Sequence, residues 1–150
     1  MPDELSTIAK RKKIAALVSE LATDTLGIPV TLTPDELTPG EFSWRLENFE
    51  TKRGKVSWLH LDVCRRGINV HSKFAAPQFA PIGANEFSGK WNHYIWPDGE
   101  TPFADIVQME LPLRLAQLVP TGATRQDRPD MMEYWAAQRA EFATQCAART

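Results

Sequence analysis

The sequence has few cysteines and no long hydrophobic run, and each absence excludes a class of protein. The only cysteines among the 150 residues are Cys64 and Cys146, with no CxxC motif, which excludes a disulfide scaffold. The most apolar window, 111–119, is interrupted by proline, arginine and glutamine and is far shorter than the ~20 residues of a membrane helix. The apolar stretch 14–18 is too short for a signal peptide. We therefore expect a cytoplasmic protein with reduced thiols and no membrane partner.

The sequence also lacks an excess of one charge and any complete catalytic or cofactor motif. Lys and Arg number 17 against 19 Asp and Glu, for a net charge of −2, so the basic footprint of a dedicated nucleic-acid binder is missing. No GxSxG, HExxH or zinc-finger spacing occurs. Segment 83–90 has the glycines and lysine of a phosphate-binding loop, but the glycines are one residue too far apart and Trp91 follows the lysine. We expect no cofactor.

What the sequence does have is the composition of one ordinary globular domain. Hydrophobic residues make up 43% of the chain and charged residues 24%. A chain of this length buries roughly 69% of the surface that its unfolded form exposes, which is enough for one core. We therefore interpret residues 1–150 as a single domain.

Apolar residues at helical spacing predict a helix near each end of the chain. Residues 14–21 place their apolar side chains on one arc, the basic run 10–13 extends beyond that packed face, and the helix ends before Gly27. A second apolar stripe predicts a helix over 129–148.

Between these two helices, prolines mark three shorter helical segments. A helical turn is predicted at 33–36, where Pro34 stands in the first turn. A helix is predicted from about 103 to 110 and a second short one at 112–119, with a strand at 106–111 as the alternative.

Three runs between residues 42 and 74 alternate apolar and polar side chains and predict an antiparallel meander. Loops of two or four residues between the runs bring all the apolar side chains to one face. A fourth strand is predicted at 90–96, where strand-forming residues stand between two turns. The sequence thus predicts an α+β fold in which an antiparallel sheet of about four strands has the N- and C-terminal helices packed on one face.

The polar face of this predicted sheet carries five of the eleven candidate binding residues. Its outward side chains are Arg45, Glu47, Trp58, His60, Asp62, Asn69, His71 and Lys73. The inward side chains are Phe42, Trp44, Leu46, Leu59, Leu61, Val63, Ile68, Val70 and Phe74. Because one face of an antiparallel sheet usually packs on the core while the other faces solvent, the outward set is available to a partner.

Two histidines and an aspartate on that face support an enzymatic alternative. In a direct hairpin register His60 lies opposite His71, with Asp62 one pleat along and cross-strand β-carbons about 5 Å apart. Two imidazoles and a carboxylate at that spacing are typical of a metal site or of an aspartate that orients an imidazole. The alternative function is therefore a metal-dependent or His-based hydrolytic enzyme that uses His60, Asp62, His71 and, as a further group, His93.

The ends of the two predicted hairpins are basic. Segment 51–73 holds six Lys and Arg residues against Asp62 alone, a formal charge of +5 in a chain of net charge −2. Basic side chains near an exposed aromatic residue such as Trp58 are typical of surfaces that contact phosphates and stack on bases. A nucleic-acid partner is therefore the alternative to a protein partner.

Segment 75–90 is a long predicted loop, which is uncommon in compact domains and favours a functional role. It leads into an aromatic strand whose tryptophans and tyrosine are residue types that concentrate in interface hot spots. The leading interpretation is a small non-catalytic module that contacts a protein or a nucleic acid through the polar face, the hairpin ends and segment 75–96. The candidate binding residues are Arg45, Arg53, Trp58, His60, Arg65, Arg66, His71, Lys73, Lys90, Trp91 and Tyr94.

Overall fold

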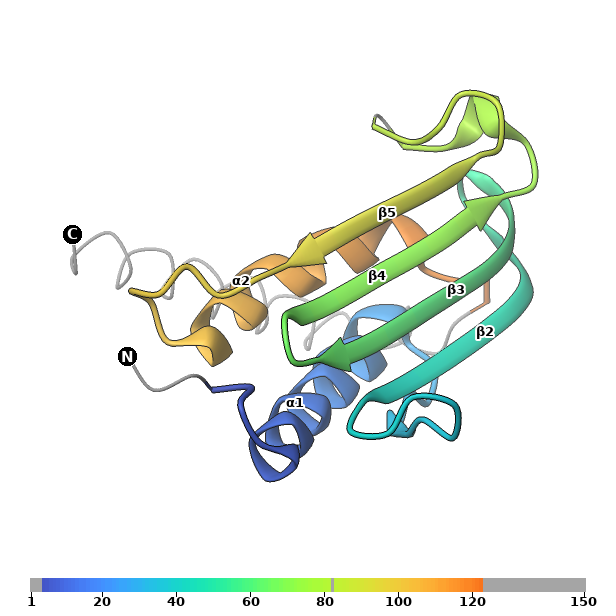
Figure 1. Ribbon diagram of the computed structural model, residues 1–150. Helices are drawn as coiled ribbons and strands as arrows, with labels where there is room; N and C mark the ends of the chain where they lie inside the picture. Colours follow the sequence, from blue (N-terminus) through green and yellow to red (C-terminus); the bar gives the residue numbers. More distant parts are fainter. Residues whose placement is uncertain (1–3, 82, 123–150) are drawn as a thin grey trace.

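Five antiparallel strands form one sheet, in their sequence order, in the computed structural model, which describes residues 4–81 and 83–122 (Figure 1). The strands are β1 (Thr33–Pro34), β2 (Phe42–Thr51), β3 (Gly54–Cys64), β4 (Gly67–Phe74) and β5 (Lys90–Ile95). Helices α1 (Ile8–Leu26) and α2 (Phe103–Leu115) lie on the same face of the sheet (Figure 1), and η1 (Pro77–Phe79) and η2 (Ala116–Leu118) are short 3₁₀ helices. The predicted α+β fold is confirmed, with five strands in place of about four.

Helix α1 begins and ends at residues whose side chains or backbone explain the boundaries. The Thr7 side chain accepts a hydrogen bond from the Lys10 N–H, which satisfies one of the free donors of the first turn. At the other end Gly27 adopts a left-handed conformation (φ 72°) and its N–H bonds to the Thr23 carbonyl. The predicted end before Gly27 is confirmed, and the basic run belongs to the first two turns of the helix.

Two of the proline-based predictions are wrong. Thr33 and Pro34 form β1, and the helical turn expected at 33–36 is replaced by a turn in which the Asp35 carboxylate accepts the N–H of Leu37. The break expected at Pro112 is absent, because α2 continues through it to Leu115. Burial of the residues around the proline outweighs the one hydrogen bond that its ring removes.

The other helical predictions have mixed outcomes. The strand considered as an alternative at 106–111 is not formed, since these residues belong to α2. The helix predicted over 129–148 lies outside the described residues. Among the helices of the described ranges, none is long and apolar enough to cross a membrane.

The core lies between the sheet and the two helices. Leu59, Leu61, Ile68 and Val70 have no exposed surface, as expected of the inward face of two central strands. A β-bulge between Val56 and Trp58 reverses the alternation, so that Val56 faces the core although Trp58 faces outward. The remaining inward residues predicted from the sequence are buried or half-buried, with Trp44 packed against the core.

Candidate functional site

The strand register aligns the polar side chains in rows across the outer face, which is the face of the sheet turned away from α1 and α2. One row is Ser43, Asp62, Asn69 and Tyr94. The next row is Arg45, His60, His71 and Asn92, and a third is Glu47, Trp58, Lys73 and Lys90. His60 thus lies opposite His71, in the register that the sequence predicts for the hairpin.

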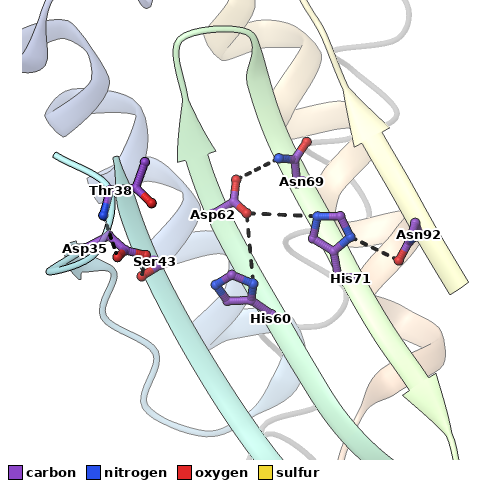
Figure 2. A network of polar contacts seen from close by, with 8 residues as sticks. All are labelled: Asp35, Thr38, Ser43, His60, Asp62, Asn69, His71 and Asn92. Atoms are coloured by element: carbon purple, nitrogen blue, oxygen red, sulfur yellow. Dashed lines mark hydrogen bonds and ion pairs between the residues drawn. The ribbon is translucent and has the colours of Figure 1, made fainter. Parts of the chain in front are cut away.

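The two imidazoles converge on one carboxylate (Figure 2). His60 Nδ1 and His71 Nε2 each lie 4.0 Å from Asp62 Oδ2, and the other oxygen, Oδ1, accepts a 2.8 Å hydrogen bond from Asn69 Nδ2. The second ring nitrogen of His71, Nδ1, lies 3.0 Å from the Asn92 side-chain oxygen. Asn69 therefore orients Asp62, and Asn92 orients His71.

Partial burial sets the charge of this group. Burial lowers the pKa of His60 below its ordinary value, while the Asp62 carboxylate acts in the opposite direction. Burial also raises the pKa of Asp62, and the two imidazoles oppose that increase. The arrangement favours a neutral His60, whose free lone pair can accept a proton or bind a metal ion.

An aromatic row continues from this group to the edge strand. The ring of Tyr94 meets His71 edge to face at 5.7 Å between centroids, and Trp96 follows at 5.6 Å from Tyr94. Tyr94 is 47% exposed and Trp96 55% exposed. On β2 and β3, the Arg45 guanidinium lies 5.2 Å above the Trp58 ring. The outer face thus presents large aromatic surfaces that the described residues leave accessible.

Two residues assigned to the candidate sites lie on the opposite face. Trp91 is only 5% exposed and packs in the core, so it is not part of the outer face. His93 pairs with Val70 on the same inward side and stacks on Trp91 at 6.4 Å between ring centroids. Because His93 is separated from His60 and His71 by the sheet, it cannot complete a site with them.

The basic candidates near the hairpin ends form two groups instead of one. Arg53 lies in the turn between β2 and β3, with Lys73 and Lys90 at the same end of the sheet. Arg65 and Arg66 lie in the turn at the other end of β3. The hairpin ends therefore do not form one continuous basic surface.

A cavity of about 400 Å³ lies beside the second basic group. Its lining residues are Arg11, Thr38, Pro39, Gly40, Glu41, Cys64, Arg65 and Arg66. Sequence reasoning missed Arg11, Glu41 and Cys64 as neighbours. The available signal was the strand pairing, because Phe42 lies opposite Val63 and this places Glu41 level with Cys64.

Segment 75–90 is a folded loop in the ranges that the structure describes. The Asn85 side chain accepts the N–H groups of Phe87 and Ser88, and the Gly89 carbonyl accepts the N–H of Phe74. Phe87 is 91% exposed on this loop. The loop extends beyond one end of the sheet, where β4 ends and β5 begins (Figure 1).

Comparisons of the chain with models of protein families, with curated proteins and with solved structures gave no match. The inference of function therefore depends on the chemistry of the outer face. In the α+β fold, the outer face is the side of the sheet that the two described helices do not cover (Figure 1).

The inward-facing His93 makes stability depend on pH. Burial, and next the Arg114 guanidinium, lower the pKa of His93 in the folded protein. The folded state thus disfavours the charged imidazole of His93. The stability associated with the neutral imidazole is fully present above the unfolded pKa of about 6.5 and is lost as the pH falls toward the lower pKa of the folded state. We expect His93→Gln to lose less unfolding free energy than the wild type between about pH 7.5 and about pH 5.5. Urea unfolding at the two pH values measures this difference, and equal losses would contradict it.

Proposed function

We propose that the chain is a cytoplasmic, single-domain and non-catalytic binding module that contacts a protein partner through its outer face. The observation that carries this proposal is the aromatic row formed by His71, Tyr94 and Trp96, of which Tyr94 and Trp96 are exposed. Tyr and Trp combine a large apolar surface with a polar group and dominate the energetics of protein interfaces. Tyr94 lies on β5 and Trp96 directly follows the strand, so the sheet positions both rings and lowers the entropy cost of binding.

The charges around the aromatic row favour a protein over a nucleic acid. Arg45 and Glu47 form an exposed ion pair at 2.8 Å, and Asp62 lies beside the row. A surface that mixes both signs around apolar rings is typical of the polar rim of a protein interface. A phosphate backbone would instead favour a continuous basic surface, which the separated hairpin ends do not form.

A His-based or metal-dependent hydrolase is the second candidate, and one observation favours it. His60 and His71 each have a ring nitrogen 4.0 Å from Asp62 Oδ2, which brings two imidazoles and a carboxylate together, the residue types that such an enzyme uses. The hydrolase has less support than the binding module. His93 lies on the other face of the sheet, and neither His60 nor His71 lines the 400 Å³ cavity.

Site-specific photo-crosslinking tests the binding module and at the same time captures the partner for identification. We expect a photoreactive phenylalanine analogue at Tyr94 to give discrete protein adducts in the source cells. The same analogue at Gln108, which is exposed on α2, serves as the control and should give none of these adducts. Once the partner is identified, Trp96→Ala should weaken its binding by at least about tenfold, as expected of a hot-spot residue.

The nature of the adducts decides between the partner classes. Adducts at position 94 that resist nuclease and disappear with protease support the proposal. Nuclease-sensitive adducts would show that the partner is a nucleic acid and not a protein. Identical adduct patterns at positions 94 and 108, or none at position 94, would contradict a binding role for the outer face.

A further inference from the structure

Three metal-ligating side chains of different types meet where β2 begins and β3 ends. Asp62 and Cys64 are two residues apart on β3, so both face outward. Glu41 directly precedes β2. One potential ligand atom from each of these three residues lies within 4.8 Å of the other two, and all three side chains are partly buried. The sheet register thus brings the thiol and one carboxylate of β3 together with the carboxylate that precedes β2.

The three ligand atoms lie near enough to meet on one metal ion after the side chains rotate. With bonds of about 2.3 Å to sulfur and about 2.0–2.2 Å to oxygen, two ligands of a tetrahedral zinc ion lie about 3.5 Å apart. Rotation of the three side chains brings atoms that lie within 4.8 Å of one another to that spacing. A thiolate combined with carboxylates suits a borderline ion such as Zn²⁺ better than the hard ions Mg²⁺ and Ca²⁺, which take oxygen ligands only.

Asp62 is oriented as the central ligand of such a site. Asn69 fixes its Oδ1 by a 2.8 Å hydrogen bond, as groups behind a metal ligand commonly do. Its Oδ2 faces the imidazoles of His60 and His71, both at 4.0 Å, which is too long for a hydrogen bond. A half-buried carboxylate oxygen that is held in place but not hydrogen-bonded by these neighbours is suited to bind a cation.

The Glu41 and Asp62 carboxylates repel each other at this site, while Arg11, Arg65 and Arg66 also line the cavity beside it. A divalent ion between Glu41 and Asp62 would offset this repulsion. The 400 Å³ cavity, which both Glu41 and Cys64 line, leaves room for a water molecule as a fourth ligand.

We propose that Glu41, Asp62 and Cys64 bind a divalent transition-metal ion of the zinc class at this end of the sheet. Binding of the ion does not depend on the proposed binding of a protein partner. Its ligands lie near the end of β3, beside the aromatic row and not within it. The imidazoles of His60 and His71 lie 4.0 Å from Asp62 Oδ2 and are not ligands in this proposal.

Cobalt titration of the metal-free full-length protein tests this proposal. Cobalt(II) is the probe, because thiolate coordination gives a charge-transfer band that carboxylate and imidazole ligands do not give. We expect the band in the wild type and its loss in Cys64→Ser, whereas Cys146→Ser, the matched control, retains it. Asp62→Asn and Glu41→Gln should weaken binding by more than roughly 100-fold, beyond the range of merely supporting residues.

Three results would overturn the proposal. They are the absence of the band in the wild type, its loss in Cys146→Ser but not in Cys64→Ser, and unchanged affinity in Asp62→Asn. A further variant, His60→Gln/His71→Gln, separates the two donor sets around Asp62. If this variant abolishes cobalt binding while Cys64→Ser retains it, the ion is held by the imidazoles and the proposed ligand set is wrong. Circular dichroism of each variant establishes that it is folded before the titration.

Discussion

Replacement of Phe74 by alanine is expected to lower the free energy of unfolding by about 3–5 kcal/mol, which is the usual cost of emptying a phenylalanine site in a core. Phe74 is 1% exposed at the end of β4, opposite Val56 of β3. It closes the core at the bulged end of the sheet, so its removal leaves a cavity that the neighbouring strands cannot fill. Because small domains have a total stability of about 5–15 kcal/mol, the loss is readily measured by urea unfolding.

The matched control is the same substitution on an exposed phenylalanine. Phe87 is 91% exposed on loop 75–90, so Phe87→Ala should change the unfolding free energy by no more than about 0.5 kcal/mol. Similar losses for the two variants would show that Phe74 does not occupy the core position described above.

The antiparallel meander could be predicted from the sequence because side-chain alternation and short turns determine the faces of its strands. Two-residue turns between successive strands keep the apolar sets on one side, and His60 therefore faces His71. The bulge at Val56 could not be predicted in this way. It inserts one residue into β3 relative to β4, and no local residue pattern marks the position of such an insertion.

The position of β5 explains what the sequence left open about the candidate site. Alternation alone places Trp91 and His93 on one face and Tyr94 on the other, but does not decide which face is inward. The pairing of His93 with Val70 settles the question, and burial of Trp91 follows from it. The meeting of Glu41 with Cys64 likewise depends on strand register, because the two residues are distant in sequence and belong to no recognisable ligand motif.

The prolines illustrate where local preference is overruled by packing. Pro112 is a poor residue for a helix interior, yet the flanking Leu111 and Leu115 are fully buried against the core. Their burial favours a continuous helix by more than the proline opposes it, at about 1.5–3 kcal/mol for each fully buried leucine. The sequence pattern shows the cost of a proline inside a helix, but it does not show the tertiary contacts of the leucines that offset this cost.

Gly89→Ala is expected to lower the unfolding free energy by about 2–5 kcal/mol, because two separate costs add at this position. Gly89 has a left-handed backbone conformation (φ 75°), which is unfavourable for alanine. A β-carbon at this position would also lie 2.4 Å from the Phe74 carbonyl oxygen, which is backbone and cannot move independently. Loop 75–90 returns to β4 at this contact, where the Gly89 carbonyl accepts the Phe74 N–H.

Gly99→Ala separates the two costs. Gly99 has a similar conformation (φ 83°), but an added β-carbon would have no neighbour within 4 Å among the described residues. Only the conformational cost of about 1–2 kcal/mol remains there, so the difference between the variants measures the close approach at Gly89. Equal losses in urea unfolding would show that the backbone of Gly89 does not lie against Phe74. A larger loss for Gly89→Ala indicates that this contact helps to fix β5, and with it Tyr94, beside β4.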